Sequence, residues 1–217
     1  MTVTATKTVR EICTTALRKI GVVANDATAT ASDMQTAKDG LDRMLKHWQN
    51  YGFQLWAVAD QTVALTTSAA HTMSPVRPVQ VLSVRYNDGS TESPMGRMTR
   101  DEYDTLPDKD ATGRPSSWYY DRQREDARLY VWPVMASVGI ETLEVTYQRE
   151  IEDADLDDAV DVPGEMYNAV VYALASELTD DFMVQAPNVI ARAEILKNEA
   201  LAFDREGSVY FAGPYAS

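Results

Sequence analysis

Cysteine, histidine and long apolar runs are the scarcest features of this 217-residue sequence. Cys13 is the single cysteine, so an intramolecular disulfide and a cysteine-rich metal site are both excluded. His47 and His71 have no second histidine or cysteine at metal-ligand spacing. No apolar run approaches the roughly 20 residues of a membrane span, and the first residues lack the apolar core of a secretory signal. We therefore expect no metal, no cofactor and no membrane contact.

Acidic residues dominate the charge of the chain. The sequence holds 33 Asp and Glu against 20 Lys and Arg, which gives a formal net charge of −13. Nucleic-acid clamps draw their affinity from Lys and Arg on phosphates, so this balance argues against such a clamp. It is compatible with a surface that DNA passes without adhering. Hydrophobic residues make up 45% of the chain, which indicates a globular protein.

The first segment with a helical period covers residues 8–20. Thr8 and Glu11 have the spacing of a capping box, and Gly21 stands where a helix is expected to end. Six apolar residues share one face: Val9, Ile12, Cys13, Ala16, Leu17 and Ile20. We expect this face, with the thiol of Cys13, to be buried.

A second amphipathic helix is predicted to open at Ser32, with Gln35 at capping-box spacing, and to close at residues 50–52. Its apolar stripe consists of Met34, Ala37, Leu41, Met44, Leu45 and Trp48. Two such helices joined by a loop predict a helical hairpin in which each hides the apolar face of the other.

The pattern changes to short alternating segments over residues 57–150. Asp88 and Gly89 form a strong hairpin signal, and one short helix is expected behind the capping-box pair Thr99 and Glu102. The aromatic runs "WYYD" and "LYVWP" suit either a ligand groove or the apolar face of a small sheet, and alternation favours the sheet. We predict a small antiparallel β-domain here.

Helical periodicity returns after residue 160. Pro163 suits the first turn of a third helix, Glu165 suits the positive end of its dipole, and Pro187 suits the first turn of a fourth helix. The apolar positions of the third helix are Met166, Val170, Ala173, Leu174, Leu178 and Phe182. Those of the fourth helix are Val189, Ile190, Ala193, Leu196, Ala200 and Phe203.

These segments predict an α+β chain that is mainly α. A four-helix body from both chain ends carries an inserted small antiparallel β-domain and an extended C-terminal arm. We expect an N-terminal helical hairpin over residues 1–56, the β-domain over 57–150, an acidic linker with the second helix pair over 151–206, and the arm over 207–217.

The acidic run "EIEDADLDDAVD" begins the second half of the helical body. Asp153, Asp155 and Asp157 have the spacing that opens a calcium loop, but Asp158 stands where the loop needs Gly and Gly164 where it needs Glu. We therefore interpret the run as a solvated acidic linker or channel surface. Its carboxylates are Glu150, Glu152, Asp153, Asp155, Asp157 and Asp158.

The last eleven residues, "GSVYFAGPYAS", contain no charged side chain, although the chain is strongly acidic. A loose chain end and a segment that fills a partner's groove both fit this composition. The residues that would make contact in a groove are Val209, Tyr210, Phe211, Pro214 and Tyr215.

The order of these segments resembles the head-to-tail adaptor proteins of tailed bacteriophages, and most of all those of short-tailed phages. The motifs that carry the resemblance are "ALRKIGV", "LDRMLKHWQNYGFQLW", "GRPSSWYYD" with "LYVWPV", and the stretch from "LEVTYQRE" through the acidic run to "MYNAVVYALASELTDDF". The resemblance covers about Val9 to Phe203, and the order and spacing of the motifs carry it.

This resemblance implies a structural virion protein of the head–tail neck, made in the host bacterial cytoplasm, and not an enzyme. It implies a ring, typically twelve-fold, of neighbouring copies that docks below the portal protein after genome packaging. Such a ring extends the channel for double-stranded DNA, helps retain the DNA and gives the tail or nozzle protein a platform. It also implies that Gly207–Ser217 is an arm that docks on the portal.

Two other functions stay open on the sequence alone, namely a peptidoglycan hydrolase acting at genome entry and a generic acidic protein-binding module. The hydrolase has no motif in its favour, because the chain lacks G-x-S-x-G and nothing singles out a carboxylate pair. Nucleotide binding is equally unsupported, because neither G-x-x-x-x-G-K-[ST] nor G-x-G-x-x-G is present.

Overall fold

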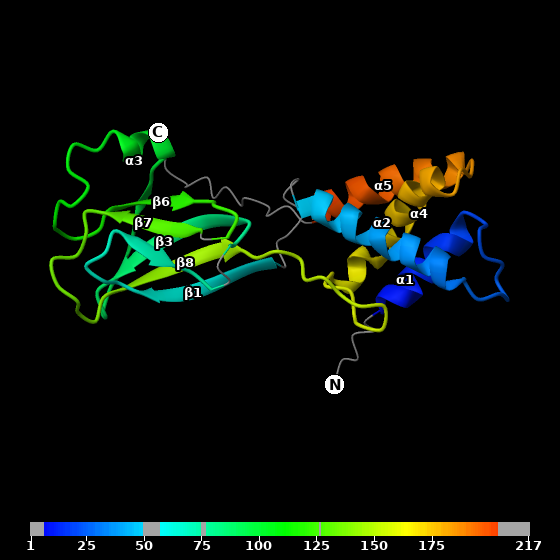
Figure 1. Cartoon of the computed structure of the whole chain (residues 1–217), viewed down its shortest axis with the longest axis horizontal. Coiled ribbons are helices and arrows are strands. Elements are labelled where there is room, and N and C mark those ends of the chain that lie inside the picture. Colours follow the sequence, from blue (N-terminus) through cyan, green and yellow to red (C-terminus); the bar gives the residue numbers. More distant parts are fainter. Residues whose placement is uncertain (1–6, 50–56, 75–76, 126, 204–217) are drawn as a thin grey trace, which may run out of the picture. The chain divides into compact units, whose positions relative to one another are not determined.

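The computed structural model divides into two compact units (Figure 1). The helical unit combines residues 1–56 with residues 151–217, and the β unit consists of residues 57–150. The α+β class is confirmed. The prediction that the chain is mainly α is not confirmed, because the β unit contributes two four-stranded sheets. The structure describes residues 7–49, 57–74, 77–125 and 127–203.

The helical unit is organised around its third long helix. Its long helices are α1 (Val9–Lys19), α2 (Ala31–Gln49), α4 (Tyr167–Asp181) and α5 (Pro187–Phe203). A short 3-10 turn, Gly164–Met166, leads into α4. α4 contacts α1, α2 and α5, and its sequence is accordingly apolar on more than one face. An amphipathic stripe on one face would leave some of these contacts without apolar partners.

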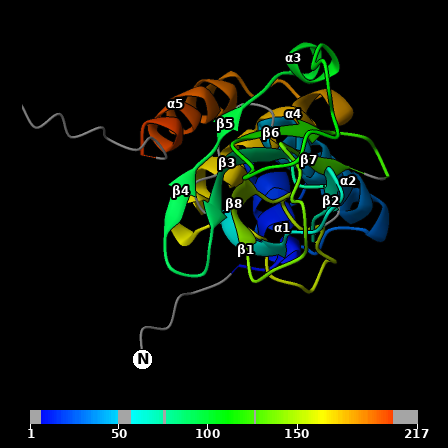
Figure 2. The ribbon, with the colours of Figure 1, turned by 90° about the vertical axis from the view of Figure 1, so that its left-hand side faces the viewer.

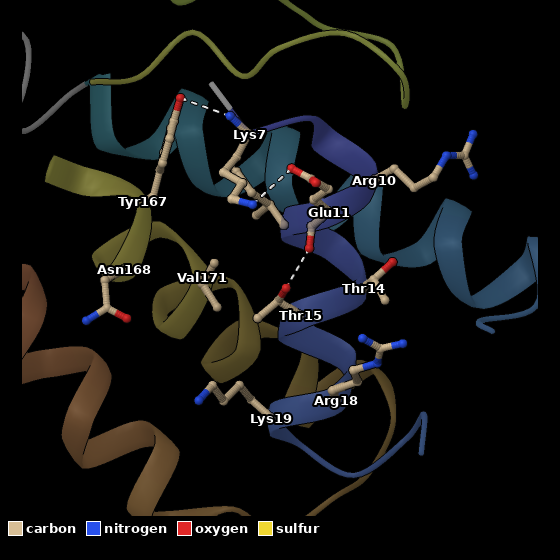
Figure 3. A pocket seen from close by; sticks show the side chains of 11 residues that line it. Lys7, Arg10, Glu11, Thr14, Thr15, Arg18, Lys19, Tyr167, Asn168 and Val171 are labelled. Carbon is tan, nitrogen blue, oxygen red and sulfur yellow. Dashed lines mark hydrogen bonds and ion pairs between the residues drawn. The ribbon is translucent and has the colours of Figure 1, made fainter. Parts of the chain in front are cut away.

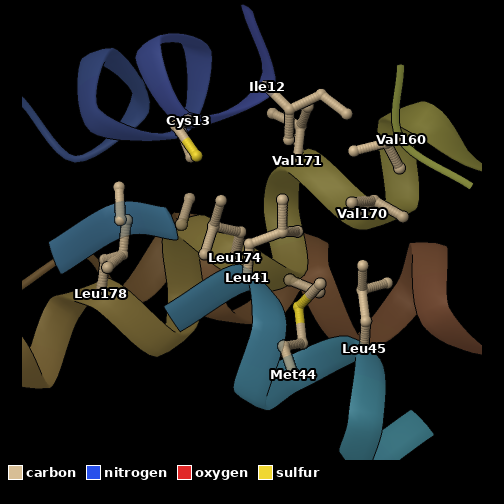
Figure 4. Packing of buried hydrophobic residues seen from close by; sticks show 14 of the residues in the cluster. Ile12, Cys13, Leu41, Met44, Leu45, Val160, Val170, Val171, Leu174 and Leu178 are labelled. Carbon is tan, nitrogen blue, oxygen red and sulfur yellow. The ribbon is translucent and has the colours of Figure 1, made fainter. Parts of the chain in front are cut away.

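Side chains from α1, α2 and α4 converge in one core (Figure 4). Ile12 and Cys13 come from α1, Leu41 from α2, and Leu174 and Leu178 from α4. The side chain of Cys13 is 0% exposed, and burial raises the pKa of its thiol to about 12. The thiolate is therefore disfavoured at neutral pH, and Cys13 acts as a small hydrophobic residue.

The predicted apolar stripes of the first three helices are confirmed, with Phe182 partly buried at the edge of the core. The stripe of the fourth helix is confirmed at Ala193 and Leu196 but wrong at Ile190, whose side chain is 40% exposed. α5 covers one side of α4, so only one narrow face of α5 is buried. The side chain of Phe203 lies outside the described residues.

Capping determines where the first two helices begin. The predicted Thr8–Glu11 capping box is confirmed at α1, and Gly21 follows the end of α1 with a φ of 77°. The predicted start of α2 is wrong by two residues. The hydroxyl of Thr30 accepts the N–H of Asp33 at 3.1 Å, and the carboxylate of Asp33 accepts the N–H of Thr30. This pair forms the same reciprocal cap one half-turn earlier than the pattern at Ser32.

The β unit contains two four-stranded sheets. The strands of the first are β1 (Val58–Ala64), β8 (Thr142–Gln148), β3 (Gln80–Asn87) and β4 (Glu92–Pro94), in that order. Those of the second are β2 (Ala70–Thr72), β7 (Arg128–Trp132), β6 (Ser117–Asp121) and β5 (Gly96–Arg97). The prediction of purely antiparallel sheets is wrong at one place, because β5 pairs with β6 in parallel. β4 and β5 are three and two residues long, too short to give a periodic signal.

Buried residues from both sheets form one core. Val84 of β3 and Val145 of β8 belong to the same cluster as Trp118 of β6, with Leu129 and Val131 of β7. The inner faces of the two sheets therefore pack against each other. The predicted hairpin at Asp88 and Gly89 is confirmed between β3 and β4, and Gly89 has a φ of 90°.

The aromatic residues of β6 and β7 divide between two faces of their sheet. Trp118 points into the core, as the sheet interpretation predicts. Tyr119 and Tyr130 instead meet Tyr103 of the short helix α3 (Arg100–Asp104), with ring centroids 5.5 and 5.1 Å from that of Tyr103. Figures 1 and 2 both place α3 beside β6. The capping box predicted at the start of α3 is also confirmed.

The first and last strands of the β unit are neighbours. β1 and β8 pair antiparallel from Val58 opposite Gln148 to Ala64 opposite Thr142. The ladder continues outward, because the N–H of Arg149 donates to the carbonyl of Ala57 at 2.9 Å. The two points at which the chain enters and leaves this unit therefore lie side by side.

The stability of the β unit is expected to fall as the pH drops from 7 to 5.5. His71 of β2 is buried, its Nε2 accepts the N–H of Thr66 at 3.2 Å, and burial lowers its pKa below the usual 6.5. The unfolded chain therefore binds a proton at a higher pH than the folded chain does. In this window the free energy of unfolding falls by at most about 1.4 kcal/mol for each unit that the pH drops. Urea unfolding at pH 7, 6.5 and 5.5, monitored by hydrogen exchange of peptides from β7, measures how the free energy of unfolding depends on pH.

Substitution of each histidine in turn shows which one causes the pH dependence. His71→Gln is expected to flatten the slope, whereas His47→Gln, on the exposed side of α2, is expected to keep it. An unchanged slope in the His71→Gln variant would contradict this prediction.

Candidate functional site

Residues 151–161, which carry all of the acidic run except Glu150, form a strap across the beginning of α1. The N–H groups of Val9 and Arg10 donate to the carbonyls of Asp158 and Leu156 at 3.0 and 2.8 Å. The N–H of Val160 donates back to the carbonyl of Lys7 at 3.1 Å. The first N–H groups of a helix have no acceptor within the helix. The strap therefore supplies the acceptors that the first turn of α1 needs.

Apolar and charged side chains of the strap have separate roles. Ile151 and Val160 are buried in the helical core. Asp157 accepts a hydrogen bond from Nε of Arg10 at 2.8 Å, which lowers the pKa of that carboxyl group. Asp153 forms an ion pair with Nζ of Lys46 at 3.0 Å. The strap is thus tied to α1 and α2 by its backbone and by two ion pairs.

The carboxylates themselves remain in solvent. The side chains of Asp153 and Asp157 are 73% and 82% exposed in spite of their ion pairs. The backbone N–H groups of Glu152 and Asp155 donate to the carboxylates of Asp161 and Asp158, respectively. The strap thus presents an acidic outer surface on an anchored backbone.

The remaining residues of the predicted sites lie elsewhere. Glu150 belongs to the β unit, where it forms an ion pair with Arg77 at 3.6 Å. The predicted arm residues Val209, Tyr210, Phe211, Pro214 and Tyr215 lie outside the described residues.

A groove of about 620 Å³ runs between α1 and α4, next to the strap (Figure 3). One row faces α4 and consists of Lys7, just before α1, with Glu11, Thr15 and Lys19 of α1. A second row consists of Arg10, Thr14 and Arg18. The wall from α4 consists of Tyr167, Asn168 and Val171. We call this feature the α1–α4 groove.

Cations outnumber carboxylates in the α1–α4 groove. Lys7 pairs with Glu11 at 3.4 Å, and Arg10 pairs with Asp157 of the strap. Arg18 donates to the carbonyl of Ala27, and the ammonium of Lys19 lies 4.9 Å from the ring centroid of Tyr172. Within the described residues, neither Arg18 nor Lys19 has a carboxylate partner. The cations at the start of α1 are therefore neutralised by this chain, and those at its end are not.

The groove is not among the sites predicted from the sequence. The four cations at positions 7, 10, 18 and 19 do not form a run, and the apolar stripe is the stronger periodic signal in the same segment. On a helix, however, positions three, four, seven and eight apart fall on one side. That spacing was a usable signal for the two rows.

Metal and membrane sites are not supported in the parts of the chain that the structure describes. No cluster of three or more His, Cys, Asp or Glu there is placed to hold a metal ion. The described helices also include none that is long and apolar enough to span a membrane.

A model of the family described as SU10 adaptor protein matches residues 7–207. The chain belongs to the SU10 adaptor protein family. The expected resemblance to phage head-to-tail adaptors is thereby confirmed for nearly the whole chain. A search of curated proteins returned no match. Membership identifies a phage adaptor protein with a structural role in the virion, which interacts with portal and tail proteins.

The strap of this SU10 family adaptor is expected to depend on its apolar anchors more than on its ion pairs. Val160→Asp places a charge in the core and should lower the free energy of unfolding by roughly 2–4 kcal/mol. It should also remove the exchange protection of the Val9 and Arg10 amides. Asp157→Asn removes one exposed ion pair and should change both measurements little. Hydrogen exchange and urea unfolding of the two variants measure this difference, and equal effects would contradict it.

Proposed function

We propose that this adaptor forms a ring of copies that docks below the portal, extends the DNA channel, helps retain packaged DNA and gives the tail its platform. The observation that carries the proposal is family membership over residues 7–207. The two-unit architecture suits it, because a ring subunit needs separate surfaces for its neighbours, for the portal and for the tail.

The charge of the chain supports a role in guiding DNA. Each copy carries a formal charge of −13, so a ring places many carboxylates around one axis. Carboxylates that face a lumen repel phosphates, and DNA then slides past without adhering. The exposed carboxylates of the strap, with Asp153 and Asp157 among them, are our candidates for such a lumen surface.

The C-terminal residues Gly207–Ser217 are our candidate for the portal-docking arm. The family match ends at residue 207, so this proposal depends on the composition of the tail and on the resemblance. Tyr210, Phe211 and Tyr215 offer apolar area to a groove, and an uncharged segment loses little hydration on burial. Ordering each arm costs conformational entropy, but many arms around a ring act together.

Assembly on the portal is the mode that we propose, with the isolated chain monomeric or weakly associated. Copies at −13 repel one another in solution. A portal that binds several arms raises their effective concentration and offsets this repulsion. A neck of the short-tailed type is the form that the sequence resemblance favours.

Deletion of residues 207–217 is expected to leave a folded adaptor that no longer binds the portal protein of the same phage. The described helices and sheets end at residue 203, so circular dichroism and thermal unfolding should match the full chain. Negative-stain images and co-sedimentation with the portal measure ring formation. A synthetic Gly207–Ser217 peptide should compete with the full chain.

The matched control replaces Tyr210, Phe211 and Tyr215 by Ser in the full-length chain, which keeps the length and removes the apolar contacts. It should bind the portal as poorly as the deletion. Normal rings from the deleted chain would refute the docking arm, and the absence of rings from the full chain would refute the ring itself.

A further inference from the structure

The cations that line the α1–α4 groove differ in whether a carboxylate of the same chain forms an ion pair with them. Lys7 and Arg10 have ion-pair partners in Glu11 and Asp157. Arg18 and Lys19, about two to three turns further along the same groove, have none within the described residues. Both are exposed side chains in a protein with 13 surplus negative charges. The described part of a single copy therefore sets no opposite charge against either of them.

The walls of the α1–α4 groove suit a carboxylate-bearing protein surface. Thr15 and Asn168 add polar groups that can hydrogen-bond to carboxylates. Ile12 and Val171 are buried beneath them and give the groove an apolar floor. A mixed lining of this kind is typical of protein–protein contacts, whereas a phosphate backbone is bound mainly by cations and polar groups. These features favour a protein occupant over DNA.

We propose that the α1–α4 groove binds an acidic surface of a second copy of this chain. The inference deepens the proposed ring function and depends on it. Copies at −13 repel each other, so a stable contact between them has to set cations of one copy against carboxylates of the next. Arg18 and Lys19 supply those cations, and every neighbour brings an excess of acids.

The groove and the acids that enter it belong to different surfaces, so the contact is heterologous and repeats from copy to copy. The contact should weaken with salt, because exposed charge pairs are screened over about 10 Å at 0.1 M ionic strength. The groove therefore contributes contact between neighbours, and the arm contributes contact with the portal.

The test compares two variants of equal net charge. Arg18→Glu with Lys19→Glu reverses the unpartnered cations of the groove. Arg122→Glu with Arg124→Glu reverses two exposed cations of the β unit and adds the same four negative charges. Copies bound per portal, measured by co-sedimentation and negative-stain imaging at 50 and 300 mM salt, should fall about tenfold or more in the groove variant. The β-unit variant should assemble almost as the unmodified chain does.

Site-specific cross-linking identifies the occupant. Thr15→Cys places a reactive thiol in the groove, while the buried thiol of Cys13, with its raised pKa, stays unlabelled in the folded protein. A benzophenone maleimide on the new cysteine, irradiated in assembled rings, should attach to an acidic segment of a second copy. Mass spectrometry of a mixture of isotope-labelled and unlabelled copies separates this product from links within one chain.

The outcomes distinguish failure of the groove contact from failure of the proposed ring function. Rings of normal occupancy from the groove variant, or cross-links to portal or DNA alone, would overturn the groove contact and leave the ring function standing. The absence of rings from the unmodified chain on its portal would overturn both. Circular dichroism of each variant shows whether a loss of assembly reflects a loss of folding.

Discussion

The helical unit depends on hydrogen bonds that close its two chain segments at the first turn of α1. Val9 and Arg10 need acceptors for their N–H groups, and Asp158 and Leu156 supply them from about 150 residues away in the sequence. Ile151 and Val160 hold this acceptor segment of the chain in the core while its carboxylates stay outside. One strap therefore satisfies a helix terminus, completes a core and creates an acidic surface.

The position of the strap also decides where charge is neutralised on the helical unit. The strap supplies acids to the start of α1 and reaches no further, so Arg10 is neutralised and Arg18 and Lys19 are not. An overall charge of −13 thus conceals a local excess of cations in the α1–α4 groove. Separation of this kind lets one subunit repel DNA at one surface and attract a protein at another.

The sequence predicted those features that depend on short-range patterns. The stripes of α1, α2 and α4 follow from helical spacing, and the caps at Thr8 and Thr99 follow from reciprocal hydrogen bonds three residues apart. The start of α2 was missed because Thr30 and Ser32 both have a capping partner, and spacing alone does not rank them. The strap and the parallel β5–β6 pair join distant residues, so no local pattern encodes them. Helical spacing indicates the rows of α1 in the α1–α4 groove, but not the wall that α4 adds. The exposure of Ile190 likewise depends on how many helices contact α5.

The pairing of β1 with β8 makes the β unit exchangeable. A domain whose two ends are neighbours can be inserted into a host protein without stretching either one, and Ala57 and Arg149 are joined by a hydrogen bond. Among the described residues, the two cores share no member. Recombination between phages could therefore replace residues 57–150 as a cassette while the helical scaffold stays unchanged.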